Sequence, residues 1–123
     1  MGSVYNSVIG SEVIIEEGAV IRDSVIIDNC VIGPGAFLDR CIVDSSCTIG
    51  KDAHIGVGDV VPNEDKPHIY DSGITVIGEN TIIPEGVRIG KNCVVYGQTD
   101  SADYKEGTLG SGQSIMKGME GEL

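Results

Sequence analysis

The sequence has no tryptophan, one phenylalanine and only two histidines in 123 residues. Basic residues are scarce too, because 8 Lys and Arg stand against 19 Asp and Glu, which leaves a formal net charge of -11. A protein this acidic repels nucleic acids and anionic membrane surfaces, so neither is an expected partner. We see no apolar run long enough to cross a bilayer and no signal peptide ahead of residue 6. We therefore expect a soluble, cytoplasmic protein.

Metal-binding motifs are missing as well. His54 and His68 stand alone, and the four cysteines form no close pair of the kind that binds zinc. We expect the cysteines to be buried, reduced thiols that act as small hydrophobic residues. Cys30 and Cys47 would be stacked neighbours in the repeat described below, but their parallel Cβ vectors fit a disulfide poorly. We predict no disulfide, no metal site and no cofactor in this chain.

A repeat of seventeen residues dominates the sequence. Three consecutive blocks, 6–22, 23–39 and 40–56, align with one another, and a partial copy returns over 75–90. Within each block, aliphatic residues recur at spacings of six, six and five, which matches no face of an α-helix. The aliphatic positions are Ile9, Ile15, Ile21, Ile26, Ile32, Leu38, Val43, Ile49, Ile55, Ile77, Ile83 and Ile89.

The residues around these aliphatic positions predict strands and corners. Two positions before each aliphatic residue lies a smaller one, and residues two apart on a strand point the same way, here toward an interior. Gly, Asn and Asp tolerate positive φ, which predicts corners at two further columns. These columns are Gly18, Gly35, Asp52 and Gly86, and Glu12, Asn29, Ser46 and Asn80. Each block should form three short strands joined by three corners, which is one triangular coil.

Stacked coils of this kind make an all-β protein, a parallel β-helix of four to five coils about 20–25 Å tall. We place the β-helix at 1–97, with an interruption at 57–73 that is either an irregular coil or a loop. After Tyr96 the pattern fades into a segment rich in Gly, Ser and charge. We therefore expect an irregular tail over 98–123.

Two of the three outward faces carry apolar columns, whereas the third is mixed. β-branched residues are favoured in strands whatever covers them, which would explain the columns without any partner. On a highly charged protein, however, an apolar outward column also indicates a covered surface. We predict an interface there, for a second copy or for another domain. Its residues are Val8, Val25, Ile42 and Val76 on one face and Ile14, Val31 and Ile82 on the next.

A resemblance to a known class follows from the segments Ile9-Gly10-Ser11-Glu12-Val13 and Ile49-Gly50-Lys51-Asp52-Ala53. They are similar to the hexapeptide repeat of left-handed parallel β-helices, over roughly residues 6–96. This resemblance, and not the spacing, implies a left-handed coil. Acyltransferases, γ-class carbonic anhydrases and sugar nucleotidyltransferases all carry the repeat, so the class alone does not define a function.

A narrower resemblance rests on Gly18-Ala19-Val20-Ile21-Arg22-Asp23-Ser24-Val25-Ile26 and on the segment from Ser72-Gly73 to Ile83-Pro84-Glu85-Gly86-Val87. Both resemble the C-terminal domain of bacterial glucose-1-phosphate adenylyltransferase, also called ADP-glucose pyrophosphorylase. In that family an N-terminal domain makes ADP-glucose from ATP and glucose 1-phosphate with Mg²⁺ for glycogen synthesis. The β-helix contributes subunit contacts and part of an allosteric site. The resemblance implies a regulatory and oligomerisation domain, whose partners are further copies or the nucleotidyltransferase domain.

Catalytic residues are not expected in this chain. It has neither the Gly-rich nucleotide loop of that family nor a set of carboxylates to hold a phosphate-bound Mg²⁺. The resemblance implies that Mg²⁺ belongs to the N-terminal catalytic domain. We expect no turnover from this chain alone, whether it is an excised domain or a natural truncated relative.

A phosphorylated effector is the expected small-molecule partner. Plant-type members of the family place one Lys directly before the Ser-Gly pair and a second Lys in the next turn, where this sequence has Asp71 and Gly78. Effector contacts must then come from other basic residues, each of which also has a plain explanation as a solvated surface charge. The candidates are Arg22, Arg40, Lys66, His68 and Arg88.

Two other functions stay open. Acyltransferases and hydratases of the hexapeptide class use His as a base or metal ligand, and only His54 and His68 are available here. A scaffold module without any small-molecule site is the other alternative, and the sequence barely distinguishes it from a regulatory domain.

Overall fold

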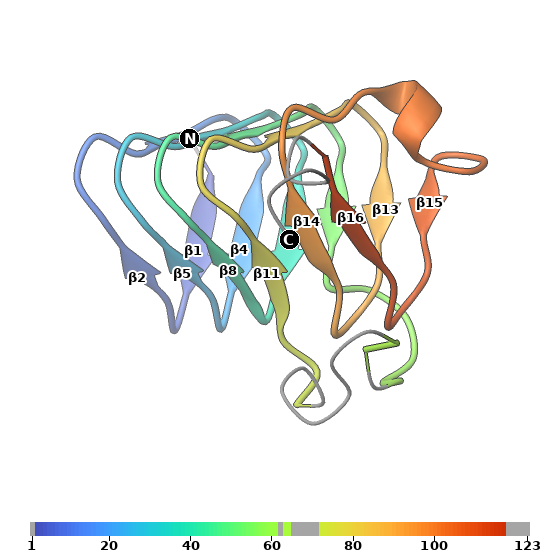
Figure 1. Ribbon diagram of the computed structural model, residues 1–123. Helices are drawn as coiled ribbons and strands as arrows, with labels where there is room; N and C mark the ends of the chain where they lie inside the picture. Colours follow the sequence, from blue (N-terminus) through green and yellow to red (C-terminus); the bar gives the residue numbers. More distant parts are fainter. Residues whose placement is uncertain (1, 62, 65–71, 118–123) are drawn as a thin grey trace.

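In the computed structural model, which describes residues 2–61, 63–64 and 72–117, the chain winds into a stack of triangular coils (Figure 1). Short strands alternate with corners, and the strands of successive coils pair in parallel to form three sheets, the walls of a prism. The structure thus confirms the predicted all-β fold, a left-handed parallel β-helix with three strands per coil.

Each wall is one sheet, and spatial order along it follows the order of the coils. The first sheet contains β1 (Ser3–Tyr5), β4 (Val20–Arg22), β7 (Phe37–Asp39), β10 (His54–Ile55), β13 (Arg88–Ile89) and β15 (Thr108–Leu109). The second contains β2 (Val8–Ile9), β5 (Val25–Ile26), β8 (Cys41–Val43), β11 (Thr75–Ile77), β14 (Val94–Tyr96) and β16 (Ser114–Met116). The third contains β3 (Ile14–Ile15), β6 (Val31–Ile32), β9 (Thr48–Ile49) and β12 (Ile82–Ile83).

The core is the set of inward aliphatic columns that the repeat predicted. Ile21 pairs with Leu38, and Ile26 with Val43, so side chains seventeen residues apart stack on one another. Ten of the twelve predicted aliphatic residues are buried. The exceptions are Ile9 and Ile15 in the first complete coil, which are half-buried because a coil covers them on one side only.

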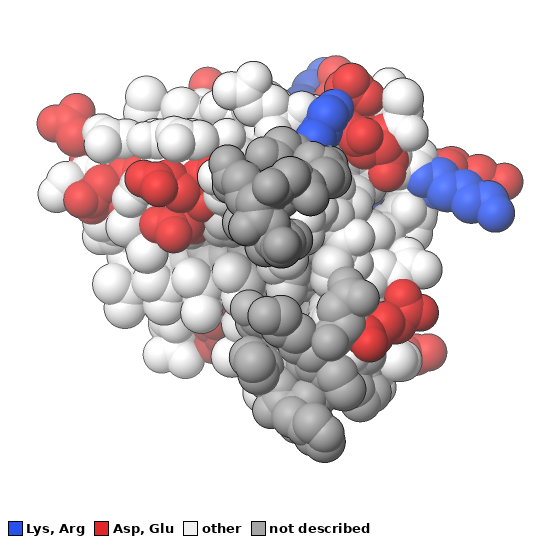
Figure 2. Space-filling view, in the orientation of Figure 1, with Lys and Arg blue, Asp and Glu red and all other residues white. Residues whose placement is uncertain are grey.

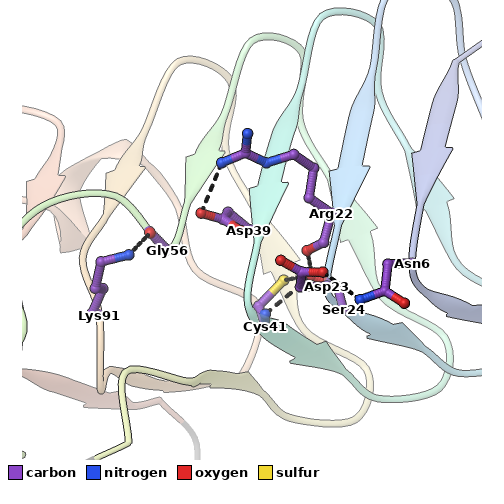
Figure 3. Close-up of polar contacts among 8 residues, drawn as sticks. All are labelled: Asn6, Arg22, Asp23, Ser24, Asp39, Cys41, Gly56 and Lys91. Carbon is purple, nitrogen blue, oxygen red and sulfur yellow. Dashed lines mark hydrogen bonds and ion pairs between the residues drawn. The ribbon is translucent and has the colours of Figure 1, made fainter.

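The corners fall at the two predicted columns and at a third that we did not identify. Glu12, Asn29, Ser46 and Asn80 have φ values of 58–62°, and Gly18, Gly35, Asp52 and Gly86 are also at positive φ. The third column consists of Asn6, Asp23, Arg40 and Asn92, with φ values of 48–56°. Arginine has no preference for this conformation, so the column was not recognisable from composition. The stacked corners are stabilised by contacts such as Asn6 Nδ2 donating to Asp23 Oδ1 at 2.8 Å (Figure 3).

The interruption at 57–73 adds no coil to the stack, and we call this segment the loop below. The strands that flank it pair directly, β8 with β11, β9 with β12 and β10 with β13, so the loop contributes no level to the stack. Because it contains a full repeat length, the chain returns in register, with Val76 opposite Ile42.

The expected irregular tail over 98–123 is wrong for residues 108–116. These residues form β15 and β16, which pair with β13 and β14. Each coil adds one strand to a sheet, so the four to five predicted coils would give four to five strands, whereas two of the sheets have six. The repeat was hidden by an insertion: Thr99 and Leu109 are ten positions apart, where Ile83 and Ile89 are six apart. A short 3₁₀ helix, η1 (Ser101–Asp103), occupies the extra residues. Residues 118–123 lie outside the described part of the chain.

Candidate functional site

The apolar column of the second sheet is exposed at its N-terminal end and covered toward its C-terminal end. Val8 is 64% exposed and Val25 36%, whereas Ile42 and Val76 are half-buried. The next outward residue of the column, Val94, is only 7% exposed. A partner that covers this face therefore gains most of its apolar contact on the first two coils.

The apolar column of the third sheet follows the same trend at the first coil. Ile14 is 55% exposed, Val31 is half-buried, and Ile82 is 39% exposed. Val8 and Ile14 lie in one coil, on either side of the corner at Glu12. The predicted interface residues thus form two columns that meet around a corner at the N-terminal end of the stack.

Acidic side chains gather at the N-terminal end of the stack. Figure 2 shows Asp and Glu gathered at the left of the molecule, over the coils that begin with β2 and β5. Asp28 accepts a hydrogen bond from the Ser11 backbone N–H at 2.8 Å, so at least one carboxylate there helps to hold a corner.

The three effector candidates that the structure describes are not brought together. Arg22 lies on β4 and Arg88 on β13, three strand spacings apart in the first sheet, or about 14 Å. Arg22 already pairs with Asp39 at 3.2 Å (Figure 3) and lies 5.1 Å from the centre of the Phe37 ring. Arg40 is exposed at the unexpected corner column. Lys66 and His68 lie outside the described residues.

Arg88 is the candidate with the clearest surroundings. A cleft of about 380 Å³ lies between the start of the loop and the last coils. Its lining residues include Arg88, Asp59 and Ser111 together with apolar residues such as Val57 and Leu109. Sequence reasoning missed the cleft, because Thr108, Leu109 and Ser111 fall in the segment that we expected to be irregular.

Two buried asparagines hold the loop against the coils. Asn92 is fully buried; its Oδ1 accepts from the Gly73 N–H at 2.7 Å and its Nδ2 donates to the Val61 carbonyl at 2.9 Å. Asn63 Nδ2 donates to the Asn92 carbonyl at 2.9 Å and to Ser114 Oγ at 3.0 Å. Together they tie both sides of the loop to one corner of the stack.

Lys91 anchors Gly56, the residue that immediately precedes the loop. Lys91 Nζ donates to the Gly56 carbonyl at 2.9 Å, as Figure 3 shows, so this cation is used within the fold. Neither the lysine nor the asparagines stood out in the sequence, because their partners are 19 to 51 residues away and follow no repeat.

The cysteines are free and buried, as expected. Burial raises the pKa of the Cys41 and Cys47 thiols to about 12, so both stay protonated at neutral pH. The thiols of Cys30 and Cys47 contact corner carbonyls, those of Asp44 and Gly78, each at 3.0 Å. They act as small core residues with a weak donor.

His54 lies on the outer side of the first sheet. Its Nδ1 is 3.0 Å from the Asp52 carbonyl oxygen, and its ring centre is 6.0 Å from that of Phe37. The described residues contain no group of three His, Cys, Asp or Glu side chains placed to hold a metal ion. Within the same residues, no helix has the length and apolar character needed to cross a bilayer.

Comparison with solved structures supports the fold. The acetyltransferase domain of PglB from Neisseria gonorrhoeae FA1090 has a TM-score of 0.62 and 23% identity, covering 94% of this chain and 46% of that one. The same domain in complex with acetyl coenzyme A gives a TM-score of 0.64 at 22% identity. At such identities the likeness shows the β-helix alone and not a shared activity.

Sequence comparison is more specific. A glucose-1-phosphate adenylyltransferase of Acetivibrio thermocellus is 41% identical over 121 residues, covering 98% of this chain and 28% of that protein. Its counterpart from Lachnospira eligens is 47% identical over 116 residues, which are 94% of this chain and 27% of the relative. The chain thus spans little more than a quarter of the length of these relatives.

The family profile described as GlmU-like, C-terminal hexapeptide matches residues 1–77. This match covers the first coils, where the repeat is most regular, the whole interruption at 57–73, and β11. The chain therefore belongs to the GlmU-like C-terminal hexapeptide family, and the curated relatives that it matches over their C-terminal part are glucose-1-phosphate adenylyltransferases.

Proposed function

We propose that this chain acts as the regulatory and oligomerisation domain of a cytoplasmic glucose-1-phosphate adenylyltransferase, and that it is not catalytic by itself. The observation that carries this proposal is the 41% identity over 98% of the chain to an enzyme of which it spans only 28%. The partner is then the N-terminal nucleotidyltransferase domain, which would supply the Mg²⁺ site and the binding sites for ATP and glucose 1-phosphate.

A domain exchange tests this proposal. The matched part of the Acetivibrio thermocellus enzyme is replaced by this chain, and ADP-glucose formation from ATP and glucose 1-phosphate is measured. We expect the hybrid to be active, because the inward columns and corners are retained, and we expect this chain alone to give no product. An inactive hybrid with intact secondary structure, next to an active parent enzyme, would contradict the proposal.

The cleft beside Arg88 is the place that we propose for a phosphorylated effector. Arg88 has no ion pair among the described residues and lies in a cleft of about 380 Å³, which is large enough for a small phosphorylated metabolite. A shift in the melting temperature with fructose 1,6-bisphosphate, AMP, phosphate or 3-phosphoglycerate, lost in Arg88→Ala and retained in Arg40→Ala, would support an effector site there. No response to any of the four compounds would favour a scaffold module.

Self-association is expected through the apolar columns. Val25→Asp together with Ile42→Asp should leave the fold intact, because both side chains point outward, and should lower the mass that light scattering measures at high protein concentration. Val60→Asp is the matched control, because Val60 is 59% exposed but lies in the loop and belongs to neither column. A monomeric parent protein, or an equal effect of the control, would contradict an interface at these faces.

A further inference from the structure

The N-terminal end of the stack has unpaired strand edges. β1, β2 and β3 are each the terminal strand of a sheet and pair on one side only among the described residues. Val8 donates its N–H to the Ser24 carbonyl at 3.0 Å, and Ile14 donates to the Cys30 carbonyl at 2.9 Å. In a parallel ladder, successive residues direct their N–H and C=O groups to opposite sides. The backbone groups of Ile9 and Ile15 therefore point away from the second coil.

Inward side chains are also uncovered at this end. Ile9, Val13 and Ile15 are half-buried, whereas the residues that stack below them, Ile26, Cys30 and Ile32, are at most 1% exposed. Val4, which stacks on Ile21, is 41% exposed. The end of the core is thus an apolar surface framed by free backbone donors and acceptors, which is a template for strand addition.

At the opposite end of the stack the chain itself covers part of the core, although β15 and β16 are also terminal strands among the described residues. Tyr104 is 3% exposed and its hydroxyl lies 2.8 Å from Thr99 Oγ1, so the insertion around η1 folds over the last coils. Lys117 Nζ donates to Asp103 at 2.8 Å and lowers the pKa of that carboxyl. Solenoids need such covering segments to shield the apolar ends of their stacks, and the described residues before β1 provide none of comparable size at the N-terminal end.

The path of the coil indicates what fits on the open end. The chain runs from the second sheet to the third and then to the first, as β2, β3 and β4 show. β1 lies in the first sheet, one level before β4, and Gly2 packs against the Ile15 side chain of β3. A chain that approaches β1 along the same path passes first over β2 and then over β3.

Charge argues against a second copy in this position. Residues 1–21 contain three glutamates, Glu12, Glu16 and Glu17, and no Lys or Arg. All three are exposed, so two such ends placed face to face would bring like charges together. A self-associated state is still compatible with the sheet faces discussed above, because those contacts lie on the sides of the prism.

We propose that the open end is a strand-docking surface for the polypeptide that leads into β1 in a longer parent enzyme. Two of its segments would pair with β2 and β3 in parallel, and their apolar side chains would cover Ile9 and Ile15. The proposal rests on the proposed function in one respect, because the relatives are longer than this chain.

Hydrogen exchange tests the proposal without any assay of activity. The seventeen residues that precede the matched region of the Acetivibrio thermocellus relative, one repeat in length, are joined to the N-terminus of this chain. We expect the amides of Ile9 and Ile15 to exchange at least about tenfold more slowly than in the chain without the extension. The amides of Val8 and Ile14, which already have acceptors, should change much less. The matched control is a scrambled extension of the same composition.

Each outcome is decisive. Protection of Ile9 and Ile15 by the native but not by the scrambled extension supports strand docking. Equal exchange with the two extensions overturns it, provided that the amides of Ile32 and Ile49 stay protected and so show an intact core. Protection of Ile9 and Ile15 in the unextended chain that grows with its concentration would assign the surface to a second copy, which also overturns the proposal. None of these outcomes depends on whether the domain exchange gives ADP-glucose, so the two proposals fail separately.

Discussion

Replacement of Gly56 by alanine is expected to lower the free energy of unfolding by about 3 kcal/mol or more. Gly56 has a φ of 88°, in the left-handed region where a side chain is strained. A Cβ there would also overlap the carbonyl oxygen of Asp39 in the preceding coil. The pairing of β7 with β10 fixes both backbones at this level, so neither can move apart without breaking it. Urea unfolding followed by far-UV circular dichroism measures the loss.

Gly86→Ala is the matched control for this experiment. Gly86 has a φ of 73°, but a Cβ at this position meets no atom within 4 Å. The control should therefore show the conformational penalty alone, about 1 kcal/mol. Equal losses for the two variants would contradict the claim that contact between coils, rather than local conformation, requires glycine at position 56.

Asn92→Ala is expected to lower the free energy of unfolding by about 2–4 kcal/mol and to release the loop from the coils. The substitution removes the acceptor of the buried Gly73 N–H and the donor to the Val61 carbonyl. An unpaired buried backbone group such as the Gly73 N–H costs about 1–3 kcal/mol, and the lost contact to the Val61 carbonyl adds to this, so the effect exceeds that of a typical surface substitution. Urea unfolding gives the free energy, and limited proteolysis within residues 57–64 reports the release of the loop.

Asn80→Ala separates the side-chain contacts from the corner conformation. Asn80 occupies the same kind of corner, with φ of 58° against 56° for Asn92, but its side chain is exposed and has no hydrogen-bond partner among the described residues. Both variants replace Asn with Ala at positive φ, so the difference between them isolates the hydrogen bonds. If Asn80→Ala were as destabilising, or if cleavage of the loop were unchanged in Asn92→Ala, the assignment of Asn92 as the loop anchor would be wrong.

The repeat made most of the β-helix predictable. Side chains seventeen residues apart share one environment, so each inward or outward assignment was supported by three or four independent copies. Ile21, Ile55 and Ile89 are buried for the same reason, and one of them would have been enough to place the others. Corners were predicted from residues that favour positive φ, and arginine does not, so the corner that contains Arg40 was missed. A neighbouring coil can impose positive φ on a residue that does not favour it.

The candidate site was much less predictable than the fold. The sequence marked basic residues but gave no distance between them, and the structure separates Arg22 from Arg88 while pairing the former with Asp39. The cleft beside Arg88 depends on the loop and on the last coils, which had no repeat to identify them. Lys66 and His68 remain candidates from the sequence alone, since they lie outside the described residues.

The sequence by itself determined the coil, its three walls and the apolar columns, because these depend on a spacing of five to six residues that is repeated in every block of seventeen. Only the tertiary structure decided how the stack ends and where the loop is held. The cap formed by Tyr104 and Thr99, the anchor at Asn92 and the open edge at Ile9 and Ile15 each occur once. A contact that occurs once leaves no periodic pattern in the sequence, and whether an edge is free depends on what lies beside it in space.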